Sequence, residues 1–223
     1  MFKLQIKYLS FFFGIVSILS FFNILYSYYF NLYLNLDTYY FTLIASSILF
    51  ITFFKFGKYD IKSNIFQKIL TIFLGYLLIP LVLSIPFYFS IYNLTFSNSF
   101  FEAISGFTST GFTVFENIKL IDQSLIIWRS STQWIGGLYF LFSIIYLIDI
   151  YDDSFKKTLT NFISFNSSEI LKQAAKIFIL YSSLTILIFI VLNIFSIRTF
   201  DSLNLSLTII SSGGFLPVNE LST

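Results

Sequence analysis

Long apolar stretches alternate with short polar breaks along this chain, and their lengths suit a lipid bilayer. An α-helix needs about 20 residues, at ~1.5 Å each, to cross ~30 Å of hydrocarbon. Charged or turn-forming residues separate the stretches that reach this length. The pattern predicts five spanning helices, at approximately Tyr8–Leu34, Thr38–Phe56, Phe66–Ile91, Ser124–Ile148 and Ala174–Ile197.

The first stretch also has features of a secretory signal. Lys3 and Lys7 precede it, as the positive residues of a signal peptide would. However, the apolar run continues to about Leu34 without a small-residue cleavage site. We therefore interpret it as a first transmembrane helix.

Lysine and arginine are distributed unevenly between the predicted loops. With a cytoplasmic N-terminus, ten of the 13 lie on the inner side and three, Lys119, Arg129 and Arg198, on the outer side. An excess of basic residues marks the cytoplasmic loops of membrane proteins. The distribution predicts a multi-pass protein with its N-terminus in the cytoplasm. We expect it in the inner (plasma) membrane.

Two apolar segments, Ser99–Val114 and Thr199–Leu216, are too short to cross the membrane as helices and lie on the predicted outer side. Each begins with an aromatic residue and an acid, and each ends in a cluster of serine, threonine and glycine. Gly111 and Gly213 lie 102 residues apart in these clusters, but the acid precedes the glycine by nine residues in the first segment and twelve in the second. The two segments are therefore an approximate internal repeat, of the kind that builds pathways in transport proteins.

Both clusters have the chemistry of a cation site. A short helix that stops inside the membrane leaves its C-terminal carbonyls there, and these favour a cation. Carbonyl and hydroxyl oxygens can replace the hydration shell of a hard cation, and the absence of carboxylates in the clusters favours a monovalent one. One such cluster alone is more typical of an external turn or a tight helix contact. Because a second copy follows, we predict two re-entrant pore loops with these ion-binding residues: Thr108, Ser109, Thr110, Gly111, Phe112, Ile210, Ser211, Ser212, Gly213 and Gly214.

Several residues near the clusters have two interpretations. Glu102 and Asp201 open the predicted short helices, where an acid complements the helix N-terminus; the alternative is a charge that attracts ions to the mouth. Trp128 and Arg129 lie where an interfacial anchor is expected, and the alternative is a pair between Arg129 and an acid near the pore mouth. Gly136–Gly137 is expected to let the fourth span pack closely against a pore helix.

Composition supports a membrane protein and excludes several kinds of function. Hydrophobic residues make up 57% of the 223 residues and charged residues 11%, against about 25% charged in soluble domains. The absence of cysteine and histidine excludes disulfides, thiolate nucleophiles, Cys/His zinc sites and imidazole-based triads. The net charge of +2 gives no reason to expect a nucleic-acid partner. We expect no enzymatic activity and no cofactor besides a permeating cation.

Two other classes of function stay open. A membrane-embedded enzyme would depend on the few titratable groups near the outer interface, Glu102, Glu116, Asp122 and Arg129. A secondary transporter with broken helices would place its interrupted segments within spanning helices.

Three stretches resemble one family of transport proteins. Residues 100–111 (FFEAISGFTSTG) are similar to the first pore helix and filter of the Trk/Ktr/HKT family of potassium uptake proteins. Residues 128–137 (WRSSTQWIGG) resemble the start of the helix that follows, and residues 209–215 (IISSGGF) resemble the second filter. The three matches occur in order and at plausible spacing, and the middle one is the most specific.

The resemblance implies an all-α integral membrane protein with a potassium-channel-like pore fold. Family members have a two-helix leader and four repeats of helix–re-entrant pore loop–helix, each giving one filter strand with one key glycine. For this chain the resemblance implies a leader over residues 1–62, a first repeat over 63–150 and a second repeat over 151–223 that lacks its closing helix. It also implies K+ as the permeating ion, with Na+ as the alternative, a homodimer in membrane lipid, and a cytosolic nucleotide-binding regulatory subunit. We expect the N-terminal part of a longer protein with an incomplete pore; the alternative is assembly with another copy or another chain.

Overall fold

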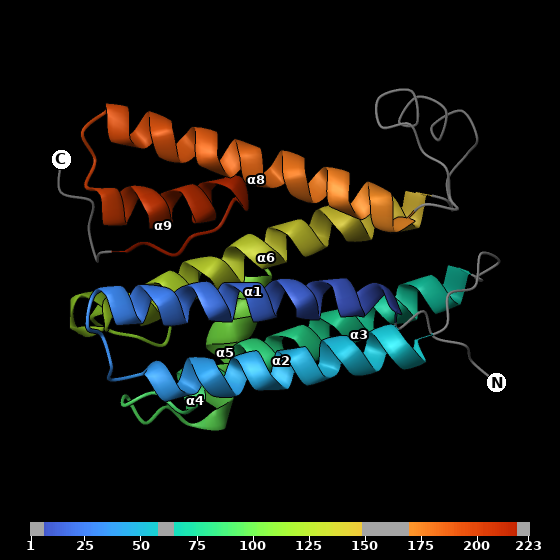
Figure 1. Ribbon diagram of the computed structural model, residues 1–223, viewed down its shortest axis with the longest axis horizontal. Helices are drawn as coiled ribbons and strands as arrows, with labels where there is room; N and C mark the ends of the chain where they lie inside the picture. The colour runs from blue at the N-terminus through green and yellow to red at the C-terminus, as the bar shows by residue number, and fades with distance from the viewer. Residues whose placement is uncertain (1–6, 58–64, 149–169, 218–223) are drawn as a thin grey trace.

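The computed structural model describes residues 7–57, 65–148 and 170–217, which fold as helices joined by short loops (Figure 1). No β-strand occurs in these three ranges. The predicted domain boundaries at 62/63 and 150/151 lie outside them. The elements are α1 (Lys7–Tyr29), α2 (Leu36–Phe56), α3 (Ile65–Leu83), α4 (Ile85–Tyr88), α5 (Phe96–Phe107), the 3-10 turn η1 (Ile118–Leu120), α6 (Gln123–Ile148), α8 (Ile170–Ile194) and α9 (Thr199–Ile210).

Four helical segments in the described ranges are long and apolar enough to cross a membrane: Lys7–Tyr29, Leu36–Phe56, Ile65–Tyr88 and Ala175–Ile194. They coincide with four of the five predicted spans. The remaining predicted span, Ser124–Ile148, is occupied by α6, whose 26 residues are long enough for ~30 Å although α6 is not among these four segments. Only 17% of the second segment and 11% of the fourth are buried, so their apolar faces need lipid or further protein around them. The all-helical membrane fold is confirmed at this level.

Two of the predicted spans end earlier than their apolar runs, for local backbone reasons. After α1, Asn31 has a left-handed φ of 56°, which a continuing helix does not permit. In the third span, Pro80 lies within α3 and Pro86 at the start of the separate helix α4. Proline has no N–H to donate and is favoured in the first turn of a helix, so α3 ends before Pro86 and a new helix begins at Ile85.

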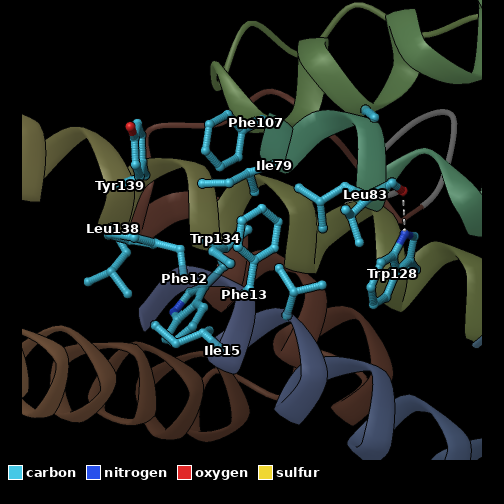
Figure 2. Close-up of a cluster of buried hydrophobic side chains, with 14 of the residues drawn as sticks. Phe12, Phe13, Ile15, Ile79, Leu83, Phe107, Trp128, Trp134, Leu138 and Tyr139 are labelled. Atoms are coloured by element: carbon cyan, nitrogen blue, oxygen red, sulfur yellow. Dashed lines mark hydrogen bonds between the residues drawn. The ribbon is translucent and has the colours of Figure 1, made fainter. Parts of the chain in front are cut away.

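The core lies where α1, α3, α5 and α6 meet (Figure 2). Aromatic and branched side chains from the four helices fill it: Phe12, Phe13, Ile79, Phe107, Leu138 and Tyr139. The hydroxyl of Tyr139 donates to the Ile72 carbonyl of α3 at 2.9 Å. This packing fixes α6 beside the short helix α5.

Trp128 belongs to this core and is fully buried. Its indole N–H donates to the Leu83 carbonyl at 3.0 Å, at the end of α3 where carbonyls lack helical partners (Figure 2). Because the ring has a buried polar partner, it does not need the membrane interface. The prediction that Trp128 is an interfacial anchor is wrong.

Candidate functional site

The two short helices, α5 and α9, have the same length, and the loops before them share one backbone feature at the same spacing. Each has 12 residues, and both their first and their last residues lie 103 positions apart in the chain. The loops before them match as well, since Asn93 and Ser196, again 103 apart, both have left-handed φ values, of 51° and 62°. In Figure 1, α9 runs beside only part of α8, and the chain after it turns back toward the end where α9 began.

The turn after each short helix has one backbone geometry. Ser109 and Ser212 have left-handed φ values of 56° and 53°. The amide of the next residue, Thr110 or Gly213, donates to the carbonyl five positions earlier, at 2.9 and 2.7 Å respectively. This is the Schellman arrangement of a helix C-terminus, with serine where glycine is usual. Each helix therefore ends in a defined turn, after which the chain runs on without helix or β-strand; residues 110–115 and 213–217 are called the first and second return strands below.

This geometry changes the register of the repeat by one residue. A spacing of 103 pairs Gly111 with Gly214, whereas the sequence comparison paired Gly111 with Gly213. The acids do not mark equivalent positions, because Glu102 lies in the middle of α5 and Asp201 in the first turn of α9. The difference of three residues between the two acid-to-glycine spacings therefore does not describe the repeat.

The two paired glycines lie against each other. Gly111 has a φ of 81°, which disfavours any other residue, and a Cβ placed on it would lie 2.6 Å from the Gly214 Cα. The two return strands therefore meet backbone to backbone at the glycines.

A cavity of about 560 Å³ lies between the C-terminal ends of α5 and α9, with Gly136 and Gly137 of α6 in its wall. Five of the ten predicted ion-binding residues line it: Thr108, Ser109, Ile210, Ser211 and Ser212. The other five, Thr110, Gly111, Phe112, Gly213 and Gly214, lie in the adjoining turns and return strands. The Phe112 side chain is 68% exposed. The structure thus brings both predicted clusters to one place, while their binding of an ion stays a prediction.

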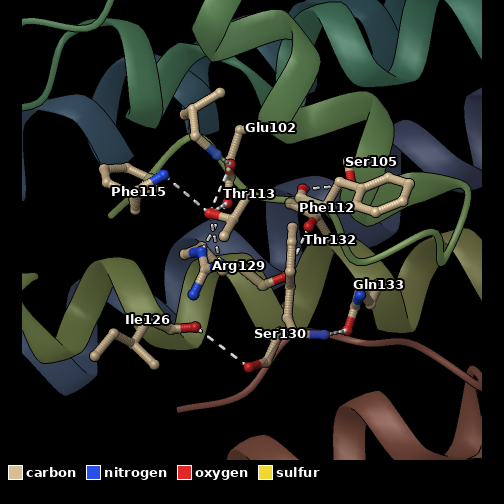
Figure 3. Close-up of polar contacts among 12 residues, drawn as sticks. Glu102, Ser105, Phe112, Thr113, Phe115, Ile126, Arg129, Ser130, Thr132 and Gln133 are labelled. Atoms are coloured by element: carbon tan, nitrogen blue, oxygen red, sulfur yellow. Dashed lines mark hydrogen bonds and ion pairs between the residues drawn. The ribbon is translucent and has the colours of Figure 1, made fainter. Parts of the chain in front are cut away.

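The first return strand is held from behind by a buried ion pair (Figure 3). The Arg129 Nε lies 2.8 Å from a Glu102 carboxylate oxygen, and both side chains are at most 1% exposed. The same carboxylate accepts from the Thr113 hydroxyl at 3.0 Å and from the Val114 amide at 2.9 Å. An Arg129 N–H also donates to the Thr113 hydroxyl at 3.1 Å. The pair therefore fixes the backbone two to three residues after Gly111.

Two interpretations of the charged residues are resolved by this pair. Glu102 does not cap α5; the N-cap is Thr95, whose hydroxyl accepts from the Asn98 amide at 3.3 Å. The anchor interpretation of Arg129 is also wrong, and its pairing with an acid is confirmed. Asp201 does lie in the first turn of α9, where it pairs with the exposed Arg198 at 2.9 Å.

The second return strand contacts the same part of α6. The side-chain oxygen of Gln133 accepts from the Phe215 amide at 3.2 Å, and a Cβ on Gly213 would collide with that same oxygen. The Phe215 ring is buried, and the Arg129 guanidinium lies 4.2 Å from its centre. A further bond joins α6 to α9, from Ser130 to Asn204 at 2.7 Å.

The predicted close packing at Gly136–Gly137 is confirmed. A Cβ on Gly136 would collide with the Phe107 carbonyl of α5, and one on Gly137 would lie 2.7 Å from the Ser211 side chain after α9. The two glycines let one helix touch the ends of both short helices.

Sequence reasoning missed Thr113 and Gln133. A signal for Gln133 was present, because it follows Arg129 by four residues and so shares its helix face. Thr113 had no separate signal, since its role depends on where the return strand passes.

The fold and the site together define a class of protein. It is an all-helical membrane protein in which two equivalent short helices end at one shared cavity. No family model matches the chain. Curated relatives include a cation transporter of Methanocaldococcus jannaschii, 29% identical over 151 residues, which covers 63% of this chain and 30% of the relative. The Trk system potassium uptake protein TrkH of Salmonella typhimurium is 26% identical over 165 residues, 71% of this chain and 34% of that protein. This chain thus spans about a third of the length of these relatives.

The fold comparison agrees with the relatives. The crystal structure of the potassium transporter TrkH from Vibrio parahaemolyticus matches with a TM-score of 0.77 at 18% identity, over 97% of this chain and 44% of that one. The likeness shows the fold. In sequence and in fold the chain is TrkH-like, and the resemblance inferred from its motifs is confirmed.

Proposed function

We propose that this chain is a pore-forming part of a Trk-type potassium uptake system, through which K+ enters the cell down its electrochemical gradient. The observation that carries the proposal is the pair of Schellman turns that bring two helix C-termini and two glycine backbones together beside one cavity. Carbonyl oxygens and the partial negative charge of helix C-termini favour a cation there. The names of the similar proteins support K+ as that cation. Na+ is the alternative that the sequence leaves open.

In this proposal, α5 and α9 belong to re-entrant loops that enter from the outer side of the inner membrane, with the N-terminus in the cytoplasm. The ten predicted residues line the ion path, with Gly111 and Gly214 as the equivalent glycines. Two strands coordinate an ion from one side only, so other polypeptide segments complete the site. A homodimer in lipid and a cytosolic nucleotide-binding regulatory subunit are part of the proposal, on the family resemblance.

The two other classes of function fit the geometry less well. A broken-helix transporter interrupts its spanning helices near mid-membrane, whereas α5 and α9 are separate helices that follow long ones. Of the four titratable groups considered for an enzyme, Glu102 and Arg129 are buried and pair with each other, which leaves only Glu116 and Asp122.

The test uses the natural gene in a host that lacks its own potassium uptake. We expect the wild type to restore growth at low K+ and Gly111→Asp to abolish it. Gly111 needs a positive φ and has no room for a Cβ, so the aspartate disrupts the site. As a control, Asn117→Asp changes an exposed residue outside the return strand and should leave growth intact. Equal rescue by Gly111→Asp would contradict the filter assignment.

A further inference from the structure

One turn of α6, from Arg129 to Gln133, lies behind both return strands. The two side chains are four residues apart, so they project from the same face of the helix, and both are buried. Arg129 holds the first strand through Glu102 and through its own bond to the Thr113 hydroxyl, and Gln133 bonds to the second strand (Figure 3). A single rigid turn thus contacts the two strands that meet at the paired glycines.

The two strands are held by different chemistry. At the 103-residue spacing, the position equivalent to Glu102 is Leu205, so the second strand has no carboxylate behind it. Among the described residues, the hydrogen bond from the Phe215 amide to Gln133 ties the backbone of the segment 214–217 to α6, and the Phe215 ring packs against the Arg129 guanidinium. Gln133 therefore holds the backbone of the second strand, as the ion pair holds that of the first.

The bond to Gln133 also determines where a carbonyl points. The Gly214 carbonyl and the Phe215 N–H belong to the same peptide unit, which is planar and trans, so they point in opposite directions. Because the N–H points at Gln133, the Gly214 carbonyl must point away from α6. Gly214 is the residue that meets Gly111, so this carbonyl belongs to the proposed ion path.

The Gln133 side chain is buried, so the presence of a polar amide at this position needs a reason. The Gln133 Nε2 is buried without a hydrogen-bond partner among the described residues, and so is one Arg129 nitrogen. A buried donor without a partner is unfavourable, and an apolar side chain of similar length would avoid that cost. The acceptor oxygen of Gln133 is the feature that an apolar side chain lacks.

We propose that Gln133 is a positioning residue for ion discrimination: its side-chain oxygen fixes the Gly214 carbonyl toward the ion, in partnership with Arg129, which fixes the first strand. This inference rests on the proposed cation-transport function. It assigns selectivity in part to a side chain that itself does not contact the ion.

The experiment compares K+ and Na+ uptake rates in cells that express the natural gene with Gln133→Met or Gln133→Glu. Methionine has a similar length without the acceptor, and glutamate keeps an acceptor whether it is charged or neutral. We expect the ratio of K+ to Na+ uptake to fall by about threefold to tenfold in Gln133→Met, the size of effect of one lost hydrogen bond. In Gln133→Glu it should stay close to the wild-type ratio.

A matched control separates positioning from general stability. Thr185→Val removes the bond from the Trp134 indole to Thr185, 3.0 Å long, which joins α6 to α8 one residue beyond Gln133. This variant should melt at a lower temperature and keep the wild-type uptake ratio. If Gln133→Met does not reach the membrane, Gln133→Asn makes the same test, because its shorter side chain withdraws the oxygen.

The outcomes distinguish this inference from the proposed function. An unchanged ratio in Gln133→Met, or an equal loss in Gln133→Glu, would overturn the role of the acceptor oxygen. A wild-type protein that takes up neither cation would instead contradict the proposed function itself.

Discussion

At the scale of single residues, the Glu102–Arg129 pair shows why a charged group can lie in an apolar interior. Each charge loses its water on burial, and the loss is offset here by a short ion pair together with the Thr113 hydroxyl and the Val114 amide. A pair of this kind is costly to break from one side, since the remaining charge keeps its desolvation penalty without a partner.

This reasoning predicts a large loss of stability for Glu102→Gln. The substitution leaves Arg129 buried beside a neutral amide, and the expected cost is ~3 kcal/mol. The matched control is Asp201→Asn, which breaks the exposed pair with Arg198 and should cost less than ~1 kcal/mol. Melting temperatures of the purified proteins in detergent provide the comparison. Similar shifts for both variants would mean that burial of the first pair does not set its strength.

At the scale of elements, close approach of helix backbones determines how α6 meets the short helices. Glycine inside a helix normally costs ~1 kcal/mol relative to alanine, so Gly→Ala is stabilising where space allows. At Gly136 the added Cβ would collide with the Phe107 carbonyl, which is backbone and cannot rotate away. The contact lies one residue before the Thr108 cap of α5.

We therefore predict that Gly136→Ala lowers both the melting temperature and the K+ uptake, by moving the end of α5 away from α6. The contrasting variant is Gly14→Ala in α1, where the added Cβ would lie 3.3 Å from the Phe50 ring, a side chain that can adjust. Uptake should be unaffected in this second variant. Normal uptake and stability in Gly136→Ala would show that the two helices have more room than the contact implies.

The elements also show which features the sequence can predict. Hydropathy and length located the long helices, because about 20 apolar residues have few alternatives to a spanning helix. The positions of the two short helices followed from the Ser/Thr/Gly clusters. The register between the two copies could not be predicted in this way, because it depends on the left-handed turns at Ser109 and Ser212. Glycine is the usual residue in such a turn, so a serine there gives no signal in the sequence. The partners of Glu102 were likewise set by packing between segments far apart in the chain.

At the scale of the whole molecule, the paired short helices give a simple rule for topology. A loop that enters and leaves on one side keeps both of its ends on that side, whereas a crossing segment separates them. Asn98 at the start of α5 and Asn117 after its return strand are both exposed and so can report this difference. Lys55 at the end of α2 lies on the predicted inner side and is also exposed.

Single cysteines at these positions test the rule against a clean background, since the chain has no cysteine of its own. In intact cells, we expect a membrane-impermeant maleimide to label Asn98→Cys and Asn117→Cys. Lys55→Cys should be labelled only after the membrane is opened. Labelling of Asn98→Cys and Asn117→Cys from opposite sides would mean that the segment between them crosses the membrane, and the paired turns would then not face one ion path. Labelling of all three from outside would instead contradict the cytoplasmic N-terminus, because the two crossing helices α1 and α2 place Lys55 on the same side of the membrane as the N-terminus.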